Sequence, residues 1–249
     1  MAHFPDAWWH ERPLILGHRG ASATAPENTL AAFRKAAEVG ADGVELDVHL
    51  SADGVPVVIH DARVDATTDG VGRVAEMPLA QLRALDASGG LPEFAGELIP
   101  TLEEVLAEVG QRLVINIELK SDDATGHLEA AVADVVRRLD LSRRVWFSSF
   151  KPYSLFRIRQ QIPEVPCGLL YGAGSFLLGV LKPLTPYEAL HPAAPFVTRS
   201  GVHRAHQRGL RVFAWTVDDS VKAQFLADVG VDGLITNDPA ALLRTLAAF

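Results

Sequence analysis

The run Gly43-Val44-Glu45-Leu46-Asp47-Val48 has the pattern of a buried β-strand that carries two acidic side chains. Successive side chains of a strand point to opposite faces, so Glu45 and Asp47 share one face while the apolar side chains line the other. Burying two bare carboxylates is costly, and a bound divalent cation removes much of that cost. We therefore expect a buried strand with a cation site on one of its faces.

Outward from this strand, strand-like runs alternate with helix-like runs along almost the whole chain. The patterns predict strands over 14–16, 43–48, 55–60, 113–119, 145–149, 165–170, 187–190, 211–217 and 233–236, and helices over 28–39, 101–109, 128–139, 153–161, 202–208, 221–229 and after 239. About eight β/α units in 249 residues match the usual length of one closed parallel barrel. The expected fold is therefore α/β, a TIM-type (β/α)8 barrel that forms a single domain over residues 1–249.

The alternation is interrupted at two places. Turn signals between Val48 and Pro100 indicate a small insertion after the second strand, over about residues 51–98. It leaves the C-terminal end of that strand, where barrel active sites lie, so we expect it to cover the site. The second interruption, 172–186, contains an apolar run over 176–184. A helix, a lip over the site and an oligomer contact are all consistent with this run.

Composition restricts the kinds of partner. A net charge of −8 argues against nucleic acid, although a cation and two basic side chains can still attract a small anionic ligand. The single cysteine, Cys167, allows no internal disulfide. Neither a signal-peptide pattern nor an apolar run of about 18 residues is present, so we expect a cytoplasmic protein without a membrane segment. The sequence does not indicate the oligomeric state.

The strand predicted over 113–119 brings more polar groups to the same rim. Glu118 and Lys120 share a face, and inside a barrel this face converges with that of Glu45 and Asp47. Three carboxylates without a cysteine suit Ca²⁺ or Mg²⁺ better than zinc. The alternative is that these acids face solvent or form salt bridges. We consider it weaker because the strands of a parallel barrel are covered on both sides.

Two histidines stand at strand ends, where barrel catalysts are found: His18 ends the first strand, and His60 ends the run over 55–60. Imidazole titrates near pH 6.5, so the pair can act as base and acid around neutral pH. We assign the remaining histidines to tails, loops or helix surfaces, although His49 shares the alternation of Asp47. They are His3, His10, His49, His127, His191, His203 and His206.

Arg19 and Lys120 are candidate phosphate ligands, because a guanidinium offers a planar fork and an ammonium a compact charge. Salt bridges to the same acids are the alternative, and both roles can coexist before substrate arrives. Phe150 and Trp215 are candidate apolar walls around the alcohol part of a substrate. Together with Phe213 they could equally belong to the core. Acids, histidines and cations in this arrangement indicate cleavage of a phosphate ester.

Seven motifs follow one another along the chain: His18-Arg19-Gly20, Pro26-Glu27-Asn28-Thr29, Glu45-x-Asp47, His60-Asp61, Ile99-Pro100-Thr101-Leu102-Glu103-Glu104, Glu118-Leu119-Lys120 and Trp215-Thr216-Val217. With them, the chain resembles the glycerophosphodiester phosphodiesterase family from about residue 13 to 245. Each motif alone is weak, but their order is specific, and no motif residue is missing. The departure is Asp218, where the family often has asparagine. We expect it to affect the polarity of the rim and not the core chemistry.

The resemblance implies a barrel enzyme that hydrolyses glycerophosphodiesters to sn-glycerol 3-phosphate and an alcohol with the help of a divalent metal. It assigns acid/base catalysis to His18 and His60, metal binding to Glu45, Asp47 and Glu118, and phosphate binding to Arg19 and Lys120. Which histidine is the base is left open, as is whether water or the substrate's own 2-hydroxyl attacks the phosphorus.

Two other functions are compatible with the same barrel. A phospholipase D-like or lyase activity on lysophospholipids would need an apolar channel for the acyl chain, and residues 176–181 are the only candidate. A non-catalytic barrel that binds a phosphodiester would be expected to have lost a histidine or a metal ligand. No such residue is lost here, so this second alternative is the weaker one.

Overall fold

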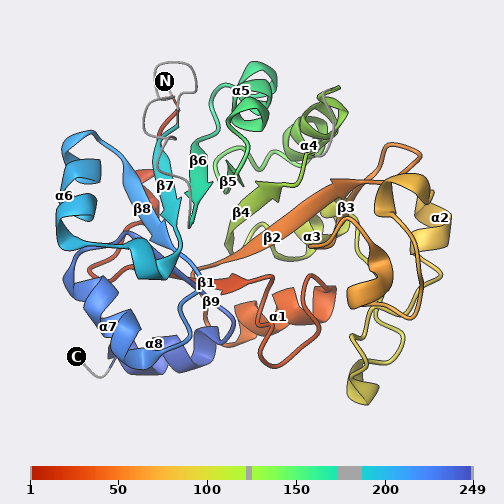
Figure 1. Ribbon diagram of the computed structural model, residues 1–249, viewed down its shortest axis with the longest axis horizontal. Coiled ribbons are helices and arrows are strands. Elements are labelled where there is room, and N and C mark those ends of the chain that lie inside the picture. Colours follow the sequence, from red (N-terminus) through yellow and green to blue (C-terminus); the bar gives the residue numbers. More distant parts are fainter. Residues whose placement is uncertain (1, 122–124, 173–186, 248–249) are drawn as a thin grey trace.

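The computed structural model describes residues 2–121, 125–172 and 187–247. Its strands are β1 (Leu14–His18), β2 (Gly43–Leu50), β3 (Pro56–Val58), β4 (Val114–Leu119), β5 (Val145–Ser149), β6 (Cys167–Tyr171), β7 (Ala189–Pro192), β8 (Arg211–Ala214) and β9 (Gly233–Thr236). All except β3 run parallel in a ring, in which β9 lies beside β1 and β1 beside β2 (Figure 1). The predicted TIM-type (β/α)8 barrel is therefore confirmed.

Helices surround the barrel (Figure 1). They are α1 (Leu30–Glu38), α2 (Leu79–Leu82), α3 (Leu102–Val109), α4 (His127–Arg138), α5 (Pro152–Gln161), α6 (Arg199–Gln207), α7 (Ser220–Asp228) and α8 (Pro239–Ala247). The bounds differ from the predicted ones by up to three residues: the strand predicted over 211–217 ends at Ala214, and the helix predicted over 202–208 begins at Arg199. Within the described ranges, no helix has the length and apolar character needed to cross a membrane.

Alternate side chains of the strands build two separate apolar cores. One, which includes Ile15 and Leu46, packs between the barrel and its helices. The other fills the barrel itself at the N-terminal ends of the strands and includes Phe213, which is fully buried. Phe4 and Trp8, from the segment before β1, pack on this interior core and close that end of the barrel. Phe213 therefore belongs to the core and is not a wall of the site.

His191 lies in the barrel interior. It is a fully buried residue of β7, so its assignment to a loop or surface is wrong; the strand extends two residues beyond the predicted end at Leu190. Trp146 donates its indole N–H to His191 Nε2 at 3.2 Å. Gly168 of the neighbouring strand leaves room for the ring, since a Cβ there would lie 2.4 Å from His191 Nε2. Burial lowers the pKa of His191 to about 3.

The His191→Gln variant is expected to lose less stability in acid than the wild type. His191 is neutral in the folded protein but gains a proton on unfolding once the pH falls below about 6.5, so its contribution to stability, complete above that pH, is lost as the pH falls towards 3. Between pH 7 and pH 5 the loss in unfolding free energy should be smaller by about 2 kcal/mol in the variant. Urea unfolding at the two pH values measures it.

The exposed His203 of α6 provides the control for that experiment, because His203→Gln also removes one histidine. It should leave the acid sensitivity unchanged. If His191→Gln and His203→Gln lose the same stability between the two pH values, the buried ring does not carry the effect.

The segment between β2 and α3 departs from the barrel pattern. β3 pairs with β2 in antiparallel fashion, and the rest of the segment, with α2, lies to one side of the barrel (Figure 1). Its side chains form a small core of their own, with Val64, Leu82 and Ile99 among its members. The boundaries of 51–98 and the covering role remain predictions. Residues 173–186 lie outside the described residues, and with them the three interpretations of the run over 176–184.

Candidate active site

The register of the strands brings the predicted polar residues together at the C-terminal end of the barrel. In the β1–β2 pair, His18 is opposite Glu45. In the β2–β4 pair, Asp47 is opposite Glu118. Because the alternation of each strand keeps these side chains on one face, they point into the same end of the barrel.

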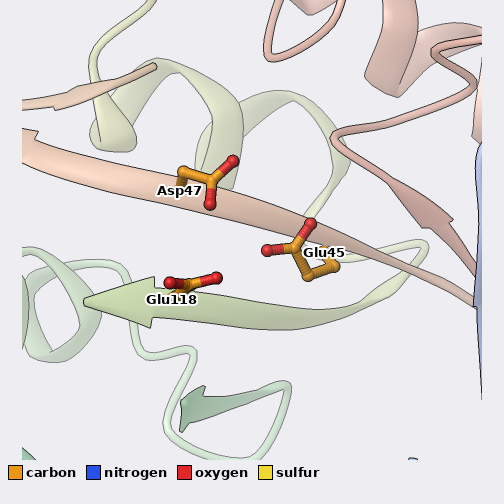
Figure 2. A group of neighbouring side chains, drawn as sticks. All are labelled: Glu45, Asp47 and Glu118. Atoms are coloured by element: carbon orange, nitrogen blue, oxygen red, sulfur yellow. The ribbon is translucent and has the colours of Figure 1, made fainter. Parts of the chain in front are cut away.

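The three acids form a compact cluster. Glu45, Asp47 and Glu118 are all buried, and each offers an oxygen that lies within 4.8 Å of those of the other two. Figure 2 shows the carboxylates of Glu45 and Asp47 on β2 grouped with that of Glu118 on the neighbouring strand β4. Only oxygen ligands are present, at spacings that fit one cation, and this donor set suits a hard divalent ion such as Ca²⁺ or Mg²⁺.

Burial and mutual repulsion of the three acids shift their pKa values. Burial raises the pKa of Glu45 well above its usual value, and the charges of Asp47 and Glu118 raise it further. Burial and Asp47 raise the pKa of Glu118 to about 7. Burial acts in the same direction on Asp47, but Lys120 and Arg19 outweigh it and lower its pKa to about 2. A divalent cation would remove this imbalance.

Lys120 and Arg19 already contact the acids. Lys120 Nζ lies 3.0 Å from Asp47 Oδ1 and 2.7 Å from Glu118 Oε1. Although burial alone would lower the pKa of Lys120, these two acids raise it to about 12, so the side chain stays charged. Arg19 Nε lies 3.4 Å from Asp47 Oδ2. The salt-bridge interpretation is therefore correct, and it is compatible with phosphate binding by the same two cations.

A tight turn after β1 positions Arg19. Its φ of +57° is unusual for a residue with a side chain, and Gly20 follows with a φ of +85°. The Arg19 backbone N–H donates to Glu45 Oε2 at 3.2 Å, and its guanidinium donates to both carboxylate oxygens of Glu27 at 2.9 Å. Asn28, also at positive φ, donates its amide N–H to Asp47 Oδ2 at 2.9 Å.

The sequence pattern assigns no role to Glu27 and Asn28, although they belong to one of the motifs. The sequence feature that could have indicated a role is the group of polar residues in the loop after β1, between Gly20 and α1. Their partners depend on how that loop folds back over the barrel, which the sequence pattern does not show.

His18 lies at the inner edge of the cluster. Its Nε2 is 4.0 Å from Glu45 Oε2, and its Nδ1 is 2.7 Å from Asn237 Oδ1, in the loop after β9. Burial lowers the pKa of His18, and the positive charge of Arg19 lowers it further. The ring is therefore neutral at pH 7 and is able to accept a proton.

His60 follows β3 by two residues. Its Nδ1 lies 2.8 Å from Asp61 Oδ1, and its backbone carbonyl accepts a hydrogen bond from His49 Nε2 at 3.0 Å. The charge of His60 contributes to the lowered pKa of Asp47, which places it within electrostatic reach of the acids. His49 is a buried residue of β2, so its assignment to a loop or surface is wrong; it supports the backbone of His60.

Phe150 and Trp215 meet at the rim, each following the end of a barrel strand. Their rings pack edge to face, with centroids 5.5 Å apart. Phe150 is 42% exposed, and the Trp215 indole N–H donates to the carbonyl of His191 at 2.8 Å. Phe150 is thus an exposed ring that packs against Trp215, and the hydrogen bond fixes the position of Trp215. Such an aromatic pair is suited to contact a bound ligand.

Comparison of the chain with known proteins identifies one family. The model of the glycerophosphoryl diester phosphodiesterase family matches residues 18–241. The glycerophosphodiester phosphodiesterase of Caldanaerobacter subterraneus is 39% identical over 236 residues, which cover 94% of this chain and 97% of the relative.

Solved structures of similar fold point to the same family. A phosphodiesterase of Oleispira antarctica, in complex with the product sn-glycerol-3-phosphate, is 34% identical with a TM-score of 0.88, over 95% of this chain and 97% of that chain. A glycerophosphodiester phosphodiesterase of Agrobacterium tumefaciens is 31% identical with a TM-score of 0.81, over 93% and 99%. This chain therefore belongs to the glycerophosphoryl diester phosphodiesterase family.

Proposed function

We propose that the protein hydrolyses glycerophosphodiesters to sn-glycerol 3-phosphate and an alcohol. The observation that carries the proposal is the buried cluster of Glu45, Asp47 and Glu118 beside the His18 ring, at the end of the barrel where such enzymes hold their substrates. Membership of the family and the product complex of the Oleispira antarctica relative support the same substrate class.

Glu45, Asp47 and Glu118 would hold one divalent cation, Ca²⁺ or Mg²⁺. Their oxygen-only donor set, their spacing and their crowded negative charge all fit such an ion. When bound, the cation supplies positive charge that stabilises the extra negative charge on the phosphate as it is attacked.

His18 and His60 carry the two proton transfers. One ring accepts the proton of the attacking hydroxyl, and the other gives a proton to the oxygen of the leaving alcohol. The attacking group is water or the 2-hydroxyl of the substrate's own glycerol. In the second case a cyclic phosphate forms first, and following the reaction by phosphorus NMR distinguishes the two routes.

Arg19 and Lys120 bind the phosphate. Both side chains lie at the edge of the acid cluster and carry a charge that the cluster keeps in place. When a cation occupies the cluster, the acids need less compensation from these two side chains, which can then turn their donors to phosphate oxygens. Phe150 and Trp215 form an apolar wall for the alcohol part of the substrate.

Release of sn-glycerol 3-phosphate from glycerophosphocholine tests the proposal. We expect hydrolysis to stop in EDTA and to return when excess Ca²⁺ or Mg²⁺ is added. A rate that is unchanged in EDTA would show that the acid cluster does not work through a metal. Absence of product under all metal conditions would contradict the proposed activity.

Lysophosphatidylcholine is the matched comparison substrate, because it has the same headgroup and an added acyl chain. We expect it to react at least about tenfold more slowly than glycerophosphocholine, since the substrate site is lined mainly by polar and charged groups. The apolar run that an acyl channel would need lies outside the described residues. A preference for the lysolipid would favour the phospholipase D-like or lyase alternative.

A further inference from the structure

A chain of hydrogen bonds connects His18 to a residue outside the acid cluster. Asn237 Oδ1 lies 2.7 Å from His18 Nδ1, and Asn237 Nδ2 donates to Asp218 Oδ2 at 2.7 Å. Asp218 follows β8 and Asn237 follows β9, so two neighbouring strand ends build the connection. Asp218 is the position at which this chain departs from the asparagine that the family often carries.

Asp218 fixes which way round the Asn237 amide lies. Its Oδ1 accepts the Asn237 backbone N–H at 2.8 Å and the Thr236 hydroxyl at 3.0 Å, while its Oδ2 accepts the Asn237 side-chain N–H. An ionised carboxylate only accepts hydrogen bonds, so the NH₂ group of Asn237 must face Asp218. In this orientation Asn237 Oδ1 also accepts a hydrogen bond from Ser22 Oγ at 3.0 Å.

This orientation determines the tautomer of His18. The Asn237 oxygen that faces the ring can only accept, so His18 Nδ1 must carry the proton. In the neutral ring Nε2 is then unprotonated, and Nε2 is the atom that faces Glu45. The nitrogen available for proton transfer is thus directed to the acid cluster.

We propose that Asp218 is a positioning residue that acts through Asn237 to hold His18 in the Nδ1–H tautomer, with Nε2 free towards the substrate. The inference rests on the proposed function only in giving His18 a catalytic role. The proposed role goes beyond the expected effect on rim polarity, because only two hydrogen bonds separate Asp218 from the His18 ring.

An asparagine at position 218 cannot do the same. It has one carbonyl oxygen, so its own NH₂ group would face one of the donors that Asp218 now accepts. The Asn237 amide would then no longer be held in one orientation. Rotated by half a turn, it presents its NH₂ group to His18 Nδ1 and favours the tautomer with the proton on Nε2.

Asp218→Asn tests the proposal, with Asp219→Asn as the control. The control makes the same change of charge on the adjacent residue, and asparagine keeps the helix cap that Asp219 provides to Lys222 N of α7. We expect Asp218→Asn to lower kcat for glycerophosphocholine about tenfold with KM changed less than about twofold. Asp219→Asn should leave both constants at the wild-type values.

Nitrogen NMR of ¹⁵N-histidine-labelled protein reads the tautomer directly and does not depend on activity. At about pH 8 the metal-free wild type should show His18, assigned by its absence in His18→Gln, with Nδ1 protonated and Nε2 bare. In Asp218→Asn the two nitrogens should move towards averaged shifts, and in Asp219→Asn they should not. Circular dichroism checks that each variant is folded.

The outcomes separate this inference from the proposed function. If the wild type releases no glycerol 3-phosphate, the proposed function fails, whereas the NMR result still decides the tautomer. If the wild type is active but Asp218→Asn keeps its kcat and its His18 shifts, the positioning role is overturned and the proposed function stands. A lowered kcat with unchanged His18 shifts also overturns it.

Discussion

Replacement of Glu45 by glutamine is expected to remove the hydrolytic activity without lowering the stability of the metal-free protein. The amide has nearly the shape of the carboxyl group and can still accept the backbone N–H of Arg19, which lies 3.2 Å from Glu45 Oε2. It lacks the charge that a cation needs and that Asp47 and Glu118 repel. We therefore expect a rate loss of at least about 100-fold, several kcal/mol of transition-state stabilisation.

Thermal unfolding with and without added metal measures the other half of this prediction. A cation that binds only the folded protein stabilises it by about 2.7 kcal/mol at a concentration 100 times its dissociation constant. The wild type should gain this stability, and Glu45→Gln should not. Metal-free Glu45→Gln should unfold no earlier than the metal-free wild type, because the neutral amide replaces a buried carboxyl group whose ionisation is already disfavoured there.

Glu108→Gln is the matched control for the Glu45 variant. Glu108 is on α3 and pairs with Arg34 at the surface, away from the acid cluster. It should keep both the activity and the stabilisation by metal. Equal stabilisation of Glu45→Gln and the wild type by metal would show that Glu45 is not a ligand.

Substitution of His18 or His60, the two proposed acid/base residues, by alanine is expected to have the second large effect. Positioned acid/base groups contribute about 10²- to 10⁴-fold, so His18→Ala and His60→Ala should each lose activity within that range. Neither ring is among the proposed metal ligands, so both variants should keep the stabilisation by metal. Undiminished hydrolysis by His18→Ala would exclude that ring from the mechanism.

A glycerophosphodiester with a nitrophenol leaving group distinguishes the two histidines. Nitrophenolate leaves without protonation, so the variant that lacks the general acid should recover most of its rate on this substrate. The variant that lacks the general base should stay slow. His203→Ala, at an exposed position on α6, controls for loss of a histidine and should behave as the wild type on both substrates.

The sequence was sufficient for the barrel and for the acid cluster because both depend on periodicity. The alternation in the run over 43–48 placed Glu45 and Asp47 on one face, and the parallel register of β2 with β4 then brought Glu118 beside them. Such a register is nearly imposed once the strands close into a ring. The rule that strand ends carry function singled out His18, at the end of β1, and His60, two residues after β3, and their catalytic role remains a proposal.

The partners that orient those residues were beyond the sequence. Asn237 comes from the far end of the chain, and its contact with His18 exists only because β9 pairs with β1. His191 was misplaced because a short apolar strand gives no sign of where it ends. Loop conformations such as the positive φ of Arg19 and Asn28 are set by tertiary contacts, so Glu27 and Asn28 could be named but not given roles.

The aromatic plug formed by Phe4 and Trp8 gives the cylinder two ends of opposite character. Ring packing around Trp146 holds one end together, while the acid cluster proposed to bind a phosphodiester through a cation lies at the other. Loops at the polar rim can therefore change during evolution to accept new headgroups, while the aromatic end keeps the barrel folded. The end of the barrel that stabilises the fold is thus separate from the end at which specificity can change.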